Sequence, residues 1–158
     1  MTDLTTDPVQ FLSWLHKNIP LTKAMQLERL DYDGESLTLT VPLGPNVNDK
    51  GTGFGGSIAA LATLAGWCLT TLQLREQGLD CDVVIARSEQ LFEAPVTGAF
   101  TARVARPDSA SCQAFIERVA TRGRGRLELS VDVECAGERA FTMTGQYAAI
   151  RRQPDTTQ

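Results

Sequence analysis

Apolar and polar residues alternate along much of this chain. The sharpest alternation lies at residues 126–135, where every second residue from Leu127 to Cys135 is apolar and those between are polar or charged. A period of two predicts a strand with one buried and one solvent-facing side. Similar runs, bounded by turn residues such as Gly, Pro and Asp, predict further strands. These lie at residues 25–32, 36–41, 83–92, 98–106, 113–122 and 139–150.

A short amphipathic helix is predicted before the first strand. Residues 7–18 place apolar side chains on one stripe, with Asp7 as the expected N-cap and Pro8 in the first helical position. Pro20 is expected to stop this helix. His16 falls on the apolar stripe, where a packed histidine is the favoured interpretation.

A second helical segment is longer and has no polar face. It begins at Gly55 or Gly56, carries no charge before Arg75, and is followed by Gly78 at a C-cap position. Such a helix must be enclosed by other elements. Its length approaches the roughly 20 apolar residues that span a bilayer. The strands around it supply an enclosure, however, so the sequence favours a buried central helix and no membrane partner.

These elements predict an α+β fold in which a curved antiparallel sheet wraps around one long central helix, with a short helix at the N-terminus. The chain of 158 residues is sized for one hydrophobic core. A single domain is therefore expected over residues 1–150. Residues 151–158 are polar and are expected to form a disordered tail.

Charge and composition limit the kinds of partner and the location that are expected for this chain. The formal net charge is −4, which argues against a general nucleic-acid partner. The first ten residues lack the basic and apolar regions of a secretory signal, so a cytoplasmic location is expected. The four cysteines are scattered and there is one histidine, which favours reduced thiols and no metal site.

The segment before the central helix is rich in glycine. Glycines at 51, 53, 55 and 56 permit positive φ angles and close approach of a bound group. The start of a helix also presents unpaired N–H groups, which suit an oxygen that carries negative charge. The alternative is a tight strand-to-helix connection that binds no ligand.

The nonapeptide from Asn48 to Gly56 resembles the signature of hotdog-fold acyl-CoA thioesterases. In the phenylacetate-type branch the pattern is Asn-x-x-Gly-Thr-x-His-Gly-Gly, and Phe54 stands here at the histidine position. Within the superfamily the chain is most similar to the YiiD C-terminal-type thioesterase domain. That likeness extends over roughly residues 8–150 and includes the helix around Trp14, residues 19–22, and the loop asparagines 46 and 48.

The resemblance implies a hotdog fold and the hydrolysis of an acyl thioester. It implies a small-molecule substrate on coenzyme A or acyl carrier protein, with coenzyme A only as part of the substrate and no separate cofactor. It also implies a homodimer, with a dimer of dimers as an alternative. The family's helix carboxylate, seven residues after the second glycine, is replaced by Thr63.

If hydrolysis occurs, Asn48 and Thr63 are expected to hold the water, and the N–H of Gly56 or Gly55 is expected to stabilise the oxyanion. The predicted catalytic residues are therefore Asn48, Gly56 and Thr63. A small or polar stripe of the helix is expected to face an acyl channel; it comprises Gly56, Ala59, Ala60, Thr63, Gly66, Trp67 and Thr70. The predicted substrate-binding residues are Gly51, Thr52, Phe54, Gly55 and Trp67.

Other interpretations stay open. Loss of the carboxylate at position 63 favours a non-catalytic module that binds acyl thioesters. A hotdog dehydratase or hydratase would need a histidine near the loop, and His16 is the only histidine in the chain. The basic run of residues 122–126 suits either a phosphate or a solvated hairpin turn.

Overall fold

The computed structural model describes residues 4–153. The helices in this part of the chain are α1 (Pro8–Asn18), α2 (Pro20–Ala24), the 3-10 helix η1 (Gly44–Asn46), α3 (Gly55–Glu76) and α4 (Ser109–Arg122). The strands are β1 (Arg29–Tyr32), β2 (Ser36–Val41), β3 (Cys81–Phe92), β4 (Phe100–Ala105), β5 (Arg124–Cys135) and β6 (Glu138–Arg151).

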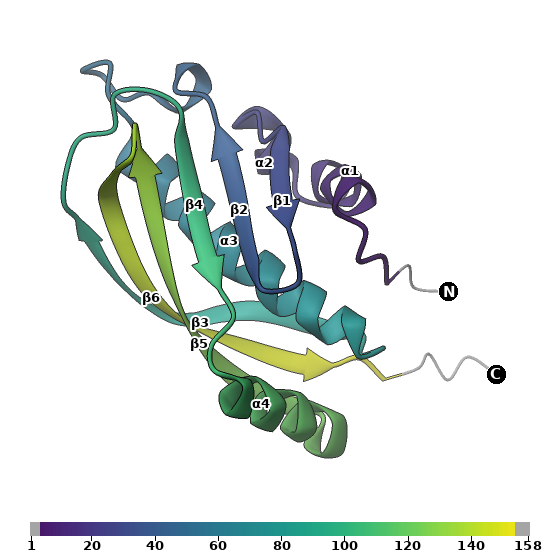
Figure 1. The fold of residues 1–158 in the computed structure, drawn as a ribbon. Coiled ribbons are helices and arrows are strands. Elements are labelled where there is room, and N and C mark those ends of the chain that lie inside the picture. The colour runs from purple at the N-terminus through teal and green to yellow at the C-terminus, as the bar shows by residue number, and fades with distance from the viewer. Residues whose placement is uncertain (1–3, 154–158) are drawn as a thin grey trace.

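The six strands form one antiparallel sheet in the order β1-β2-β4-β5-β6-β3. The sheet curves around α3, while α1 and α2 lie beside β1 and α4 lies at the opposite end (Figure 1). The predicted hotdog α+β architecture is confirmed, as are the first helix and the central helix with its start at Gly55.

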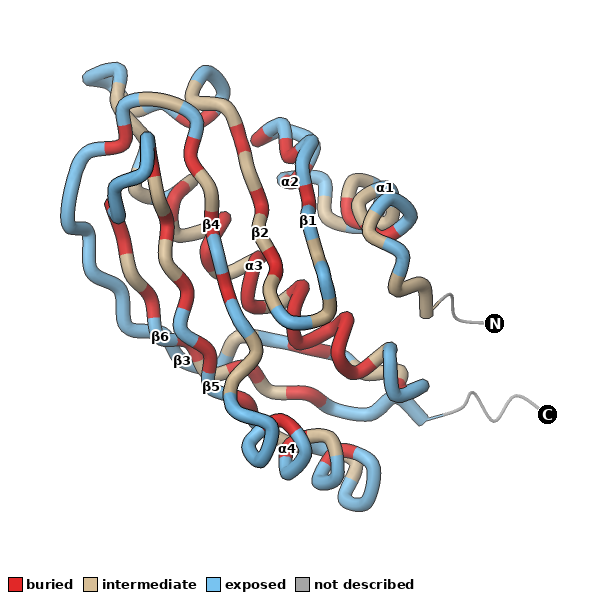
Figure 2. Tube along the Cα trace, viewed as in Figure 1, coloured by how far each residue is buried: buried red, intermediate tan, exposed pale blue. Residues whose placement is uncertain are grey.

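The central helix is enclosed along most of its length. Leu61, Leu69 and Leu72 have no exposed surface, and Figure 2 shows buried positions along the helix where the sheet crosses it. By length and composition α3 is apolar enough to cross a membrane, but 67% of its most apolar window is buried inside the protein. Its apolar character is therefore accounted for by the core.

One close approach fixes how α3 packs on the sheet. Gly66 lies against the phenol of Tyr147, which is fully buried on β6, and an added Cβ at Gly66 would overlap the phenol oxygen. That hydroxyl donates a hydrogen bond of 2.8 Å to the carbonyl oxygen of Thr63. Burial raises the pKa of the Tyr147 phenol above its usual range, so the group stays a neutral donor.

The prediction of a strand at 113–122 is wrong, because this segment belongs to α4. The Asp108 carboxylate caps the helix by accepting a hydrogen bond of 2.9 Å from the N–H of Ser111. The buried side chains Cys112, Phe115 and Val119 repeat at helical spacing. The predicted hairpin turn at residues 122–126 is wrong as well, since this run joins a helix end to a strand.

Smaller differences occur near the two ends of the chain. Pro20 begins α2 rather than only stopping α1, so the first strand starts at Arg29 and not at Met25. Part of the predicted tail is ordered, because Arg151 belongs to β6 and Arg152 pairs with Asp82 at 2.7 Å. Residues 154–158 of that tail lie outside the described residues. All four cysteines are free thiols.

The contact between Gly66 and Tyr147 predicts a strong stability effect. Gly66→Ala should lower the free energy of unfolding by about 2 kcal/mol, because the added methyl group overpacks a buried contact. The matched control is Gly98→Ala, since an added Cβ there meets no atom within 4 Å. Urea unfolding of both variants would measure the difference. Equal midpoints would contradict the proposed packing constraint.

Candidate functional site

The loop before α3 is held by a buried asparagine. Asn46 is 2% exposed, and its Nδ2 donates hydrogen bonds to the carbonyl oxygens of Met25 at 3.0 Å and Pro42 at 2.8 Å. Its own carbonyl oxygen accepts a hydrogen bond of 2.8 Å from the N–H of Phe54, and Gly53 donates to Val96 at 2.7 Å. These bonds fix where the helix begins.

Asn48 organises the tip of this loop. Its Oδ1 accepts hydrogen bonds from the N–H groups of Lys50 at 2.8 Å and Thr52 at 3.1 Å. Its Nδ2 donates to the Thr52 hydroxyl at 2.8 Å. Gly51 has φ of 79°, a left-handed conformation that this tight turn requires of a glycine. The Asn48 amide, predicted to hold a water, is therefore engaged in shaping the loop, together with Thr52.

The first turn of α3 presents open hydrogen-bond donors. Phe54 occupies the N-cap position and supplies no side-chain cap, and the first helical hydrogen bond runs from Ile58 N–H to the Phe54 carbonyl at 3.0 Å. Among residues 4–153, the N–H groups of Gly55, Gly56 and Ser57 have no acceptor. Their partial positive charge, added to that of the helix dipole, suits a developing oxyanion.

Two exposed aromatic rings flank these donors. An added Cβ at Gly56 would lie 2.5 Å from the Phe54 ring, and one at Gly55 would lie 3.3 Å from the Phe92 ring. Phe54 and Phe92 are 53% and 57% exposed, although Phe92 also packs edge to face on Phe141. The two apolar rings therefore form a slot around the helix start, and glycine at 55 and 56 leaves room for them.

An apolar pocket of about 300 Å³ lies further along the same side of α3. One wall is formed by α3 itself, with Ala60, Thr63, Leu64 and Trp67 at helical spacing. The remaining walls come from β3 and from the segment that contains α2. They comprise Ile19, Leu21, Thr22, Met25 and Ile85.

The predicted stripe of small and polar residues is only partly correct. Ala60, Thr63 and Trp67 line the pocket as expected. Gly66 instead faces Tyr147, and the Thr70 hydroxyl is buried and donates to the Gly66 carbonyl at 2.8 Å.

Trp67 closes the far end of the pocket in a fixed orientation. Its indole N–H donates a hydrogen bond of 2.7 Å to the carbonyl oxygen of Val83. The ring stacks on Trp14 with centroids 5.9 Å apart and an interplanar angle of 8°. The Arg75 guanidinium lies over the Trp14 ring, 4.7 Å from its centroid. This wall is rigid, so it sets a limit on pocket length.

Thr63 lines the pocket and also reaches Met143 on β6. Its hydroxyl makes one weak contact, to the Met143 sulfur at 3.9 Å. The side-chain amide of Gln90 approaches the same sulfur at 4.0 Å. Thr63 and Gln90 therefore bring a hydroxyl and an amide to one thioether. Sequence reasoning missed Gln90, because its position relative to Thr63 depends on the pairing of β3 with β6.

Carboxylates are not gathered at this site. α3 contains no acidic residue before Glu76, which lies at the far end and accepts a hydrogen bond from the Tyr32 hydroxyl. Asp49 pairs with Lys50 at 3.0 Å and its side chain is 81% exposed. Within residues 4–153 no cluster of His, Cys, Asp or Glu has the arrangement of a metal site. The available chemistry is hydrogen bonding from backbone N–H, hydroxyl and amide groups.

Several solved structures have the same fold as this chain. A protein of unknown function from Chlorobaculum tepidum TLS superposes with a TM-score of 0.87 at 28% identity, covering 95% of this chain and 100% of that chain. A putative thioesterase from Shewanella oneidensis gives a TM-score of 0.81 at 30% identity, covering 90% and 96%. A thioesterase from Haemophilus influenzae shares the fold alone, with a TM-score of 0.74 at 15% identity and coverage of 97% and 96%.

One protein-family model matches almost the whole described chain. The model described as "Putative thioesterase (yiiD_Cterm)" matches residues 9–151, a range that includes the glycine loop, the central helix and all six strands of the sheet. The chain therefore belongs to this thioesterase family.

Proposed function

We propose that this protein hydrolyses an acyl thioester carried by coenzyme A or by an acyl carrier protein. One observation carries the proposal: Gly56, whose N–H group is open, lies on the same helical stripe of α3 as the pocket residues Ala60, Thr63 and Trp67. Between Gly56 and Trp67 the helix rises about 16 Å. A thioester carbonyl at the helix start would thus have an apolar path for its acyl chain.

The residues present suit nucleophilic attack by water. The carbonyl oxygen accepts hydrogen bonds from the N–H groups of Gly55 and Gly56 as it gains negative charge. Thr63 lies about 10 Å along α3 from Gly56, so in the proposed dimer its hydroxyl and the Gln90 amide orient the water toward a carbonyl held at the helix start of the second copy. The water forms the new C–O bond as the C–S bond breaks. The water's proton ends on the departing thiol or in solvent. Asn48 acts indirectly, because its amide holds the loop that positions the two glycines.

The proposed substrate contacts follow the same path. Phe54 and Phe92 flank the thioester at the helix start, and Gly51 and Thr52 shape the loop on which Phe54 sits. Trp67 meets the end of the acyl chain. Aromatic and aliphatic walls around a few polar groups are typical of small-molecule sites.

The lack of a helix carboxylate favours a second candidate function. A protein that kept the N–H groups and the pocket without a base would bind acyl thioesters and release no thiol. Both candidates predict binding at the same place. They differ in turnover, which is directly measurable.

A homodimer is part of the proposal, because β3 is an open edge. β3 pairs with β6 only, and the inner-face residues Ser88 and Gln90 are exposed even though they point to the side of α3. Val84 and Leu91 on its outer face are 53% and 65% exposed. A long, partly apolar edge invites strand pairing. A second copy on β3 would also cover the site, since Phe92 and Gln90 belong to this strand.

Gly56→Val is predicted to abolish function. The larger side chain would displace the Phe54 ring and fill the slot at the helix start, removing an interaction worth about 100-fold or more in turnover. Thiol release from short, medium and aromatic acyl-CoAs would be followed, with Gly98→Val as control. Unchanged turnover in Gly56→Val would place the site elsewhere. Saturable binding by the native protein without thiol release would support the non-catalytic alternative.

Thr63→Val should reduce kcat about 10-fold with little change in KM, because it removes a hydroxyl that orients water and leaves the shape of the pocket almost intact. Thr63→Ser keeps the hydroxyl and should retain turnover near the native level. Steady-state kinetics on the best acyl-CoA would test the pair. Equal kcat in the valine variant and the native protein would remove Thr63 from the mechanism.

Val84→Lys should convert a dimer to a monomer, because a charge on the open edge opposes strand pairing. Val9→Lys is the matched control, since Val9 is 75% exposed on α1 and away from β3. Sedimentation velocity is expected to give twice the chain mass of 17.2 kDa for the native protein and for the control. A monomeric native protein would refute the dimer.

A further inference from the structure

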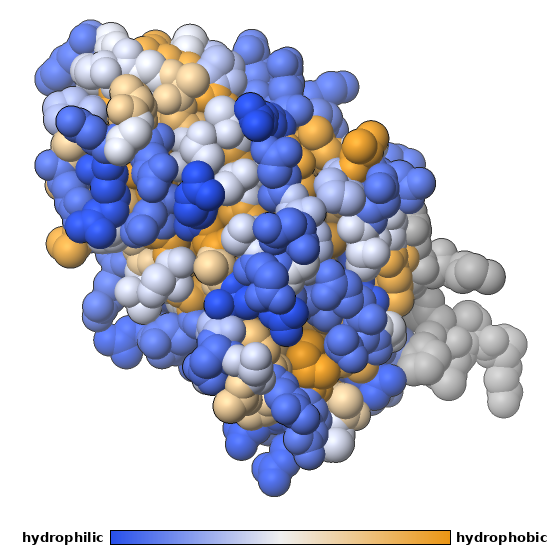
Figure 3. Space-filling view, viewed as in Figure 1, coloured by the Kyte–Doolittle hydropathy of each residue, from blue (hydrophilic) through white to orange (hydrophobic). Residues whose placement is uncertain are grey.

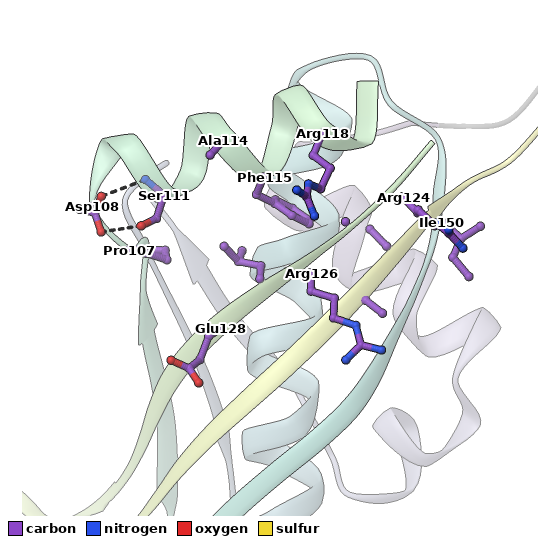
Figure 4. Close-up of a pocket in the computed structure, with 14 residues that line it drawn as sticks. Pro107, Asp108, Ser111, Ala114, Phe115, Arg118, Arg124, Arg126, Glu128 and Ile150 are labelled. Atoms are coloured by element: carbon purple, nitrogen blue, oxygen red, sulfur yellow. Dashed lines mark hydrogen bonds between the residues drawn. The ribbon is translucent and has the colours of Figure 1, made fainter. Parts of the chain in front are cut away.

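A second hollow lies between α4 and the adjoining ends of β5 and β6. Its volume is about 860 Å³ (Figure 4). Gly123, with φ of 75°, turns the chain directly from α4 into β5, so the last turns of the helix lie beside the first residues of the strand. Phe115 packs close to Gly125, where an added Cβ would lie 3.3 Å from its ring. The hollow is thus built into the junction of helix and strand.

Three arginines line this groove. Arg124 and Arg126 alternate along β5 and so share one of its faces, while Arg118 comes from α4. Figure 4 shows the three toward the end near Ile150, and the carboxylate of Glu128 toward the other end. In the described chain, no ion pair or hydrogen bond engages any of these three guanidinium groups.

Three arginines without an ion pair line the same groove, which no other part of the described chain shows. The sequence carries a net charge of −4, and most of the other arginines have a carboxylate within 4 Å. These pairs are Arg29–Asp31, Arg87–Glu89, Arg106–Glu35, Arg139–Glu93 and Arg152–Asp82. Three cations on the lining of one groove give it a positive potential, which favours a bound anion.

Stabilisation of the C-terminal end of α4 explains the positions of Arg122 and Arg151, which lie next to the groove, but not those of the groove arginines. Arg122 lies in the last turn, where a cation favours the helix dipole, and Arg151 donates to the Ala120 carbonyl at 3.2 Å. Arg124 and Arg126 are strand residues, and neither bonds a helix carbonyl. Their placement in the groove has no such structural explanation.

We infer that this groove binds a small organic phosphate with two or more negative charges. Guanidinium groups bind phosphate oxygens bidentately, and three of them match a dianionic or diphosphate group. Apolar atoms reach the surface beside α4 (Figure 3), and Ala114, Ala148 and Ile150 in the lining would contact the organic part. The carboxylates of Asp108 and Glu128 end the positive surface, so the groove suits a compact ligand and not an extended polyanion.

The groove is separate from the thioester site. Val133 pairs with Phe141, which contacts Phe92 beside the start of α3. Along β5 the span from Arg126 to Val133 is about 23 Å at about 3.3 Å per residue. Occupation of the groove therefore does not depend on the proposed thioester chemistry.

Calorimetric titration of the native protein with ADP, coenzyme A, inorganic diphosphate and adenosine would test the inference. ADP or coenzyme A is expected to bind more tightly than diphosphate and adenosine, because both the charge and the apolar lining contribute. Equal affinity for ADP and adenosine would overturn the role of the arginines. Equal affinity for ADP and diphosphate would show that the apolar lining does not contribute to binding. If neither ADP nor coenzyme A bound, the proposed site would be refuted.

Arginine variants and amide NMR spectra would show where ADP binds. Arg124→Gln with Arg126→Gln should weaken ADP binding at least about 10-fold, and Arg118→Gln alone should weaken it from the helix side. Arg103→Gln, an exposed arginine on β4, is the control and should leave it unchanged. ADP should shift the Gly123 and Gly125 amide signals. Shifts confined to Gly55 and Gly56 would assign the phosphate to the thioester site and refute the separate groove.

Discussion

The structure depends on the enclosure of a helix that has no polar face. α3 contacts β2, β3, β4, β5 and β6, and a flat sheet cannot reach one helix from so many directions. The sheet is therefore curved, and small residues are needed where helix and sheet come closest. Gly66 meets this need against Tyr147, whose hydroxyl also bonds the helix backbone. The curvature of the sheet, the register of its strands and the sequence of α3 are thus all set by the need to enclose this helix.

The same constraint determines where chemistry is possible. In the buried part of α3 the backbone N–H groups donate to carbonyl oxygens of the preceding turn. The free backbone N–H groups therefore lie in the first turn. Asn46 and Asn48 hold the preceding loop in place, and neither covers those donors. The helix start is left facing an apolar slot and pocket. The proposed function uses these donors to polarise a carbonyl without a charged side chain.

The sequence allowed most of the architecture and the helix start to be predicted, because alternation and an uncharged helix are local signals. It did not allow α4 to be recognised. The turn residues on either side of residues 113–122 suggested a strand, although Phe115 and Val119 repeat at helical spacing. Gln90 was missed for a different reason. Its approach to Met143 arises from strand pairing and a bulge in β3, which no local pattern encodes.

The two ends of the molecule have different chemical character. The start of α3 offers neutral donors and apolar walls, while the junction of α4 and β5 offers unpaired cations. The central claim concerns the first of these. A crystal structure with a non-hydrolysable acyl-CoA analogue tests it most directly. The account predicts the thioester carbonyl oxygen within hydrogen-bonding distance of the Gly55 or Gly56 N–H and the acyl chain between Thr63 and Trp67. An acyl group bound away from α3 would contradict it.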